Sequence, residues 1–442
     1  MKSIPKIKMS LRQKITKLKQ SNFDFLTGIY THSGDLCQMN VGFKKIIIIN
    51  HPEYAKHVLQ TNLANYPKDN FYQLTEQIIG KNILTTNDID FWSTHRKMMA
   101  GVFQPDSVQG MSSDIIDEVE KSIRSIEKNK PLCINRMATR LTLHVITRLL
   151  FSMAISDKQI EKLDELLNYF SNLLIKKRRP FSFPIIPLLN PSFRKSHAEF
   201  KRLIHDIIQA GGNSYSDDFL ARLKSYQCPV TSKSLTNDEL FSESALMLFA
   251  GHETTANALT WLIITLSKYP SIRQCLQEEI RNVLQDKPLD VADLEKMPLL
   301  RAVVMEVLRL FPSFPAVPRY SLKDDEIDGY HIPANAMVVI NIAMIQRHPG
   351  FWSNPEGFMP ERFINQKAQH KYAFLPFING PRVCIGNSLA LLELQIMTVL
   401  LLQRFTLNLL PGEDVSTNFI ISLRTKKDVY AQVESATIQK FK

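Results

Sequence analysis

The segment Phe377-Ile-Asn-Gly380-Pro-Arg382-Val-Cys384-Ile-Gly386 decides the fold of this 442-residue chain. A cysteine thiolate binds a metal ion only where its surroundings keep it deprotonated and protected from oxidation. Gly380 and Gly386 permit tight turns and close approach of the backbone to a flat ligand, and backbone N–H groups there can hydrogen-bond to the sulfur. The helix expected from about Ser388 adds a favourable positive end. We therefore predict that Cys384 is a metal ligand.

The same segment allows a plainer interpretation, in which Cys384 is a buried structural thiol in a loop rich in glycine and proline. The complete pattern FxxGxRxCxG, however, resembles the signature of the cytochrome P450 family. The resemblance implies that Cys384 is the axial ligand of the iron of haem b, that Phe377 shields the sulfur, and that Arg382 binds a haem propionate. It implies cofactor contacts for four residues of the segment, namely Phe377, Gly380, Arg382 and Gly386.

The segment Ala250-Gly-His-Glu253-Thr254-Thr255 interrupts a helical pattern that runs from about residue 238 to 267. Glycine lowers helix stability by roughly 1 kcal/mol relative to alanine, and a local rule broken inside a helix indicates function. A hydrogen bond from Thr254 to the preceding turn is the structural alternative. In the family, this motif crosses the distal face of the haem. The resemblance therefore makes Thr254 a hydrogen-bond donor to the oxygen being activated and Glu253 a proton relay, as the two predicted catalytic residues.

Two further motifs contain charged residues that the resemblance assigns to the protein scaffold. Glu306 and Arg309 are three residues apart and share one face of a predicted apolar helix that stops at Pro312. On a protein surface such a pair would contribute little to stability. Together with Arg362, in the segment Pro360-Glu-Arg-Phe363, they match a structural charge network of the family.

Three other residues match positions that bind the haem propionates in the family. Trp92 and Arg96 are four residues apart and share a helical face, and Arg319 follows a proline-rich turn. Taken alone, the first two suggest a packed indole beside a solvated guanidinium, and Arg319 suggests a surface charge. All the motifs occur in family order from residue 92 to 386, which supports the cofactor role.

The periodicity predicts a mainly α protein with small β-sheets. The expected elements are a hairpin at 36–49, a short helix from Pro52, mostly helix over 91–310, short strands at 327–341, an irregular segment at 349–383, a helix from about 388, and short strands from 406 onward. The resemblance implies the cytochrome P450 fold. It would form a single large helical haem domain over residues 21–442, with the haem between the distal long helix and the Cys-loop helix.

The net charge of +11 is concentrated in residues 1–20, which contain seven lysines and arginines and no acidic residue. This segment is predicted to be a basic arm or an amphipathic helix, because Ile4, Ile7, Leu11, Ile15 and Leu18 would share one helical face. Such a helix could lie on anionic lipid. A charge so localised, with no zinc-finger or RNA-binding signature, argues against nucleic-acid binding.

The scattered cysteines suit a reducing compartment rather than a disulfide framework. They are Cys37, Cys133, Cys228, Cys275 and Cys384. No segment reaches the roughly 18–20 apolar residues that a membrane span needs, and the N-terminus lacks the apolar core of a signal peptide. We therefore expect a soluble, bacterial-type, monomeric member in the cytoplasm, with peripheral membrane contact as an alternative.

The residues at family positions for the substrate cavity are mostly apolar, so we expect a fatty acid, a terpenoid or a steroid as substrate. The candidates for the wall of this cavity are Phe71, Tyr72, Leu74, Ala250, Phe314, Ala316, Val317, Phe419 and Ile420. The segment 166–200 mixes basic and apolar residues and is expected to form a lid over the entrance, or else a solvated loop over an ordinary core.

The sequence thus predicts a cytochrome P450 monooxygenase that inserts one oxygen atom from O₂ into a hydrophobic substrate. No flavin or nicotinamide fingerprint is found, so electrons are expected from a separate ferredoxin, flavodoxin or reductase. One alternative is a peroxide-driven hydroxylase or a haem-thiolate isomerase, whose members often lack the pair Glu253 and Thr254. The other alternative is a non-catalytic haem sensor, against which the complete oxygen-activating motif argues.

Overall fold

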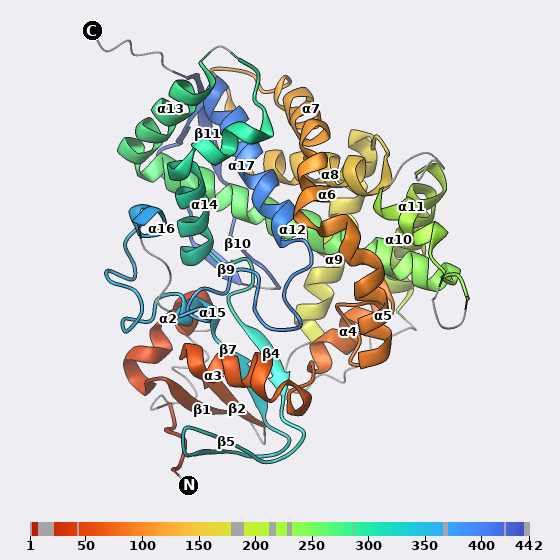
Figure 1. Ribbon diagram of the computed structural model, residues 1–442, viewed down its shortest axis with the longest axis vertical. Coiled ribbons are helices and arrows are strands. Elements are labelled where there is room, and N and C mark those ends of the chain that lie inside the picture. The colour runs from red at the N-terminus through yellow and green to blue at the C-terminus, as the bar shows by residue number, and fades with distance from the viewer. Residues whose placement is uncertain are drawn as a thin grey trace.

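The computed structural model describes residues 2–7, 22–41, 44–177, 190–211, 218–227, 232–285, 287–365, 370–419 and 421–436. A large helical part adjoins a smaller part built on a β-sheet that lies nearer the N-terminus (Figure 1). The mainly α fold with small sheets, expected from the periodicity, is confirmed.

The helices are α2 (Asn22–Ser33), α3 (Pro52–Lys56), α4 (Asn70–Ile79), α5 (Ile89–Ala100), α6 (Pro105–Gly110), α7 (Ser112–Ile123), α8 (Ile134–Phe151), α9 (Asp157–Lys177), α10 (Pro191–Ala210), α11 (Phe219–Ser225), α12 (Asn237–Lys268), α13 (Pro270–Leu284), α14 (Pro298–Leu310), α15 (Ile342–Ile345), α16 (Glu361–Asn365) and α17 (Asn387–Arg404). Short turns of other helical types are η1 (His57–Thr61), η2 (Leu63–Asn65), η3 (Gly101–Phe103) and η4 (Val291–Lys296).

The strands are β1 (Leu36–Val41), β2 (Lys44–Ile49), β3 (Pro131–Cys133), β4 (Val317–Tyr320), β5 (Asp325–Ile327), β6 (Tyr330–Ile332), β7 (Met337–Ile340), β8 (Phe405–Leu409), β9 (Thr417–Phe419), β10 (Leu423–Thr425) and β11 (Tyr430–Ser435). The main sheet has the order β1-β2-β7-β4, with β2 and β7 parallel. The predicted hairpin is confirmed, because Leu36 pairs with Ile49 at its open end. Three smaller sheets have the orders β3-β11-β8, β10-β9 and β5-β6.

Helix α12 runs through the centre of the helical part (Figure 1) and is buried along most of its 32 residues. A reciprocal cap starts it: the Thr236 hydroxyl accepts from the Glu239 N–H, and the Glu239 carboxylate accepts from the Thr236 N–H. Pro270 ends it and opens α13, since proline cannot continue a helix. Helices α8, α10, α14 and α17 pack against α12, which fixes the position of its central motif.

The first described residues are extended rather than helical. Ile7 donates from its backbone N–H to the Gln38 carbonyl at 3.0 Å, and Gln38 donates to the Pro5 carbonyl at 2.8 Å. Ile4 and Ile7 are buried against the sheet. Residues 5–7 add to the edge formed by β1, while Lys2 forms a bridge with Tyr330 of β6. The rest of the predicted arm or amphipathic helix, residues 8–20, lies outside the described residues, and the choice between these two forms stays a prediction.

The irregular segment predicted at 349–383 contains one short helix, α16, which follows Pro360. The centre of the predicted lid, residues 178–189, lies outside the described residues. Its flanks belong to α9 and α10, where Phe170, Leu174, Phe193 and Phe200 are buried in the core. These four aromatic and aliphatic residues therefore contribute to core packing and not to a mobile surface.

The carboxylate of Glu306 is the centre of a buried charge network. It accepts from Arg309 through two hydrogen bonds of 2.7 and 2.8 Å, from the Arg362 guanidinium at 3.1 Å, and from the Met359 N–H at 2.9 Å. Glu306 and Arg309 are fully buried. The Arg309 guanidinium also donates to three carbonyls, at 2.9, 2.7 and 2.9 Å, which belong to Gln346, Pro355 and Gly357. The network therefore ties α14 to the irregular segment.

Replacing Glu306 with alanine would leave two arginines buried without their carboxylate. We expect the Glu306→Ala substitution to lower the free energy of unfolding by about 3–5 kcal/mol, the usual cost of removing one partner of a buried ion pair. The measurement is urea-induced unfolding followed by circular dichroism.

The matched control for this substitution is Glu127→Ala. Glu127 pairs with Lys130, and both side chains are about two-thirds exposed, so we expect a change within about 1 kcal/mol. Equal losses in the two variants would contradict the structural role of Glu306.

Candidate active site

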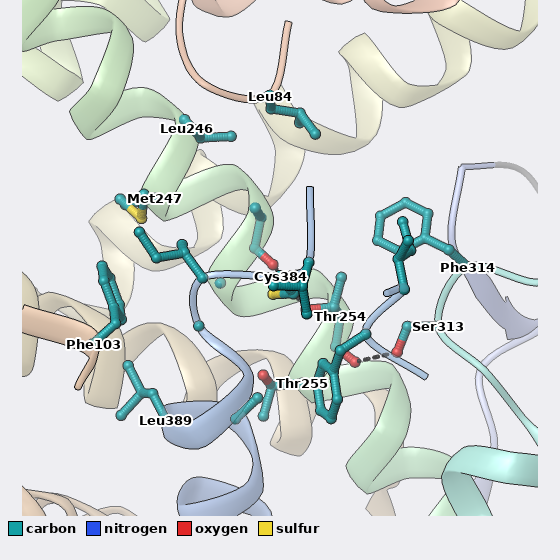
Figure 2. Close-up of a pocket in the computed structure, with 18 of the residues that line it drawn as sticks. Leu84, Phe103, Leu246, Met247, Thr254, Thr255, Ser313, Phe314, Cys384 and Leu389 are labelled. Atoms are coloured by element: carbon teal, nitrogen blue, oxygen red, sulfur yellow. Dashed lines mark hydrogen bonds between the residues drawn. The ribbon is translucent and has the colours of Figure 1, made fainter. Parts of the chain in front are cut away.

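A cavity of about 250 Å³ lies between α12 and the segment that contains Cys384. Figure 2 shows Cys384 near its centre, Thr254 beside it on α12, Leu246 and Met247 toward one end, and Phe314 toward the other. The two strongest sequence motifs therefore face one another across a single enclosed space.

The loop before Cys384 is closed by its own backbone. The Cys384 N–H donates to the Phe377 carbonyl at 3.0 Å, and the Val383 N–H donates to the Gly380 carbonyl at 3.1 Å. Gly380 has a φ of 84°, and a Cβ there would lie 2.5 Å from the Leu59 carbonyl oxygen, so only glycine fits. Ile378 has a φ of 59°, which is rare for a β-branched residue and indicates backbone strain in the wall of the cavity.

The surface of Cys384 that is exposed faces the cavity, while protein surrounds the thiol on its other sides. Burial raises the pKa of this thiol, and a hydrogen bond from the Gly386 N–H and the positive charge of Arg96 act in the opposite direction. A metal ion bound to the sulfur would add a much larger positive charge and deprotonate it. The predicted N–H contact to the sulfur is thus present at the start of α17.

Four positive side chains line the same cavity: Lys68, Arg96, Arg319 and Arg382. Burial, Arg382 and Arg319 lower the pKa of Lys68 to about 6. Burial, Arg319 and Arg96 lower the pKa of Arg382 to about 10. The Nη1 atom of Arg382 is buried without a hydrogen-bond partner. An anionic ligand with more than one carboxylate would satisfy this group, and a haem with two propionates is such a ligand.

Two other features fit a flat ligand. The ring of Trp92 lies 4.0 Å from the Arg382 guanidinium and 5.7 Å from that of Arg96, so the indole packs between two cations. Gly386 lines the cavity, and a Cβ built there would meet no protein atom. The space beside Gly386 is therefore open on the side where a macrocycle bound to Cys384 would lie. The residues present fit haem b.

Lys68 was not found by the sequence analysis. Its ammonium donates to the backbone carbonyls of Ile83, Leu84 and Thr86, and its backbone forms a bridge with Arg319. A lone lysine after Tyr66-Pro67 gives no sequence signal for this position, since its carbonyl partners follow 15 to 18 residues later.

Thr254 and Glu253, the predicted catalytic pair, point in different directions. Thr254 lines the cavity, and its hydroxyl donates to the Ala250 carbonyl at 2.8 Å. This is the hydrogen bond to the preceding turn that the structural alternative predicts. The Ser313 hydroxyl donates to the Thr254 carbonyl at 3.2 Å (Figure 2). Glu253 does not line this cavity and accepts from the Ser422 hydroxyl at 2.6 Å. Successive residues of a helix point about 100° apart, and Glu253 lies on the side of α12 that faces away from this cavity.

Glu393 is a second residue that the sequence analysis missed. It lies on α17 and is the one acidic side chain among the described residues that line the cavity. Burial raises the pKa of Glu393 to about 8, against a hydrogen bond with Thr255. Its Oε1 atom is buried without a partner. The available signal was an acid within the apolar stretch 389–405.

Only part of the predicted substrate wall lines the cavity. Tyr72, Ala250 and Phe314 do so. Leu74, Ala316 and Val317 are buried in core clusters, since Leu74 lies on the inner face of α4 and the other two pack on the main sheet. Phe71 and Phe419 pack against the outside of such clusters. These five residues do not line this cavity, so their contact with a substrate stays a prediction, and Ile420 lies outside the described residues.

Other elements supply the missing part of the wall. The additional apolar residues are Ile83, Leu84, Phe103, Ile146, Leu150, Leu246, Met247 and Ile342. Leu246 and Met247 precede Ala250 by four and three residues on α12, so helical spacing could have found them. Ile146 and Leu150 come from α8, which has no local motif, and only the packing of α8 on α12 brings them to the cavity.

One cluster of described residues has the composition of a metal site, but its hydrogen bonds disfavour it. Asp35, His51 and His348 have possible ligand atoms within 4.8 Å of one another. The Nδ1 atoms of His51 and His348 accept from the backbone N–H groups of Glu53 and Gly350. Each neutral ring therefore keeps its proton on Nε2, which leaves no lone pair there for a metal.

The comparisons with known proteins agree with this geometry. A family model described as Cytochrome P450 matches residues 6–431. Cyclooctat-9-en-7-ol 5-monooxygenase of Streptomyces melanosporofaciens is 27% identical, over 88% of this chain and 85% of that protein. Cytochrome P450 3A29 of Sus scrofa is 31% identical, over 74% of this chain and 70% of that protein.

Solved structures show the same fold. The chain is similar to the haem domain of cytochrome P450DA, with a TM-score of 0.86, 20% identity, and 98% of each chain covered. Within the described residues, no helix combines the length and the apolar character needed to cross a bilayer. Since the family model extends over the cysteine loop, the distal helix and the charge network alike, the chain belongs to the cytochrome P450 family of haem b monooxygenases.

Proposed function

We propose that this protein hydroxylates a neutral, hydrophobic molecule of the terpenoid type, with Cys384 as the residue that would bind the haem iron. The observation that carries the proposal is the composition of the cavity. The wall around Thr254 is formed by aliphatic and aromatic residues from α8, α12 and the segment at Ile83 and Leu84. A wall of this kind binds an apolar ligand and orients it through a few polar groups.

The charge distribution favours a neutral substrate over a fatty acid. The cations of the cavity, Lys68, Arg96, Arg319 and Arg382, influence one another's pKa values and so lie together at one end. Two haem propionates would bind to cations at that end. The wall that α8 and α12 contribute contains no lysine or arginine among the described residues that line the cavity, so a substrate carboxylate would find no cation there. The relative from Streptomyces, which is named for a cyclic alcohol, supports a terpenoid-like substrate.

The residues in and around the haem cavity would have separate roles in the reaction. The haem supplies the oxygen chemistry, and the protein supplies the ligand, the protons and the substrate orientation. Arg96, Arg319, Arg382 and Trp92 would hold the propionates, with Phe377 against the sulfur. The hydroxyl of Thr254 would hold a proton at the distal side, and Glu253 and Glu393 are the acids that can resupply it. Ser422 positions Glu253 through a hydrogen bond, and Thr255 forms a hydrogen bond with Glu393.

The electron donor and the location extend the same proposal. Members of the family generally use O₂, a hydrophobic substrate and electrons from a redox partner. We propose a separate ferredoxin or flavodoxin-like donor and a cytoplasmic monomer, because the scattered cysteines suit a reducing compartment. Contact of residues 1–20 with an anionic membrane surface would be peripheral.

A ligand titration tests the proposed substrate class. We expect cyclic terpenoid alcohols to convert the ferric absorption spectrum of the holoprotein from low spin to high spin, because an apolar ligand displaces water from the iron. Sterols and long-chain fatty acids are the comparison ligands. A spin shift caused by fatty acids alone would contradict the neutral substrate.

The role of Thr254 predicts a loss of coupling. We expect Thr254→Ala to lower the yield of oxygenated product per electron consumed at least about tenfold, with release of hydrogen peroxide, because a proton donor contributes roughly 10²–10⁴-fold. The matched control is Thr260→Ala. Thr260 makes the same bond to the preceding turn, at 2.8 Å, and does not line the cavity. Equal coupling in wild type and Thr254→Ala would refute the assignment.

The neutral form of Glu393 predicts a pH dependence of stability. The carboxyl has an ordinary pKa of 4.5, and burial raises it to about 8. Between these values the folded protein retains a proton that the unfolded chain releases, so the stability contributed by the neutral acid decreases as the pH rises. We expect Glu393→Gln, which mimics the neutral acid, to gain stability over wild type across this window, by up to about 1.4 kcal/mol per pH unit.

The measurement for Glu393 is the free energy of unfolding of both proteins at several pH values. Glu127→Gln, at an exposed position, controls for the loss of a carboxylate. Parallel curves for wild type and Glu393→Gln would show that Glu393 titrates like an ordinary glutamate.

A further inference from the structure

Helix α12 has a second cavity on the side opposite the haem site. Glu253 lines it together with Asp164 and Asn168 of α9 and Arg424 of β10, and its volume is about 390 Å³. The Glu253 carboxylate is held toward this side by the Ser422 hydroxyl, at 2.6 Å, and the Asn257 amide donates to the same hydroxyl at 3.0 Å. Thr254, the next residue, lines the haem cavity. Two adjacent residues of α12, Glu253 and Thr254, therefore line two different cavities.

The second cavity is polar where the first is apolar. Besides Asp164 and Glu253, its ionisable residues are Arg136, His252, Arg424, Lys426, Lys427 and Asp428. The side chains of Arg136 and Asp428, which pair with each other, are 74% and 43% exposed, so this end of the cavity reaches the surface. Polar cavities of such size hold water that hydrogen-bonds to the lining groups. Protons from solvent can therefore enter this space.

Asp164 lies inside this cavity without a cationic partner. The Asn168 amide donates to its carboxylate at 3.0 Å, and Arg424 donates to the Asn168 oxygen at 3.1 Å. The arginine therefore contacts Asn168 and not the carboxylate of Asp164. Among the described residues, no lysine or arginine forms an ion pair with Asp164 or with Glu253. Both carboxylates are half-buried, and each accepts a hydrogen bond from a neutral side chain, Asn168 for Asp164 and Ser422 for Glu253.

The environment of Asp164 also favours a protonated carboxyl. Burial raises the pKa of Asp164 and the negative charge of Glu253 raises it further, while His252, the Asn168 hydrogen bond and Arg424 lower it. The net direction is upward. An acid with a raised pKa that faces both solvent and a second acid can pass protons between them.

We propose that the polar cavity behind α12 supplies protons to Glu253, with Asp164 as the outer proton donor and Ser422 as the residue that positions Glu253. In each transfer one O–H bond breaks at Asp164 and one forms at Glu253, directly or through water. Asp164 then regains a proton from solvent at the Arg136 end. No electrons move in this step. The inference rests on the proposed function, because it takes Glu253 as the inner acid of an oxygenase.

The first experiment needs no turnover. Infrared difference spectra of the ferric holoprotein compare wild type with Asp164→Asn across a pH series. We expect a C=O band of a protonated carboxyl that persists above the ordinary titration range of aspartate and is lost in the variant. The matched control is Asp157→Asn, on the same helix, because Asp157 is 58% exposed and paired with Arg140. Absence of the Asp164 band would overturn the proposal.

The second experiment measures turnover with a substrate that gives a spin shift. We expect Asp164→Asn to reduce the oxygenation rate at least about tenfold and to raise the solvent deuterium isotope effect, with unchanged haem content and substrate affinity. Ser422→Ala is expected to give the same kinetic change while it keeps the infrared band. Asp164→Glu, which restores the acid, is expected to recover most of the rate.

The outcomes separate this proposal from the function on which it rests. A wild-type protein that oxygenates its substrate, with Asp164→Asn equal to Asp157→Asn in rate and isotope effect, would overturn the proton route and leave the oxygenase assignment intact. A wild-type protein that binds haem but oxygenates none of the ligands that shift its spin state, with competent electron donors, would overturn both.

Discussion

Four like charges at one end of the haem cavity are the constraint on which this structure depends. Lys68, Arg96, Arg319 and Arg382 come from four separate segments of the chain, and folding brings them together in a partly buried place where repulsion is weakly screened. Carboxylates of a bound ligand would convert this repulsion into attraction. The family's cofactor therefore acts as a structural part of the protein, since a ligand that binds only the folded state stabilises that state.

The other half of the site depends on a rigid connection from the charge network to the cysteine. The side-chain amide of Gln346 donates to the carbonyls of Leu308 and Arg309, and its oxygen accepts from the Leu375 N–H at 2.8 Å. Leu375 lies two residues before Phe377. The end of α14 is thus linked through one buried side chain to the loop that presents the thiol. These buried hydrogen bonds hold the Cys384 loop in place, so the position of the thiol does not depend on the stiffness of the loop itself.

The sequence was informative where chemistry requires particular residues at fixed spacing. Cys384 and Thr254 could be placed on one cavity because thiolate ligation and a broken helix each leave a local pattern. Lys68 and Ile146 could not, because their place in the site comes from contacts between distant elements: the bridge to Arg319 for the first and the packing of α8 on α12 for the second. The direction of Glu253 was not predictable from the motif, because adjacent residues of one helix, such as Thr254 and Thr255, can line the same cavity.

The substrate wall was the least predictable part for a related reason. Val317 and Ala316 occupy positions near Phe314 in the sequence, yet the chain enters β4 at Val317 and the side chains turn into the sheet. Apolar character does not distinguish a residue that lines a cavity from one that fills a core. Only the positions of the neighbouring elements decide between them, and those positions are long-range properties of the fold.

The hydrogen bonds from Lys68 to the carbonyls of Ile83, Leu84 and Thr86 have a practical consequence for the study of this protein. Three hydrogen bonds to carbonyls require the protonated ammonium of Lys68. Burial beside two arginines lowers the pKa of Lys68, and a nearby anion would raise it again. Ile83 and Leu84 belong to the wall that would meet the substrate. Preparations that have lost their cofactor would therefore present an altered binding surface, so ligand screens and inhibitor design require fully haem-loaded samples.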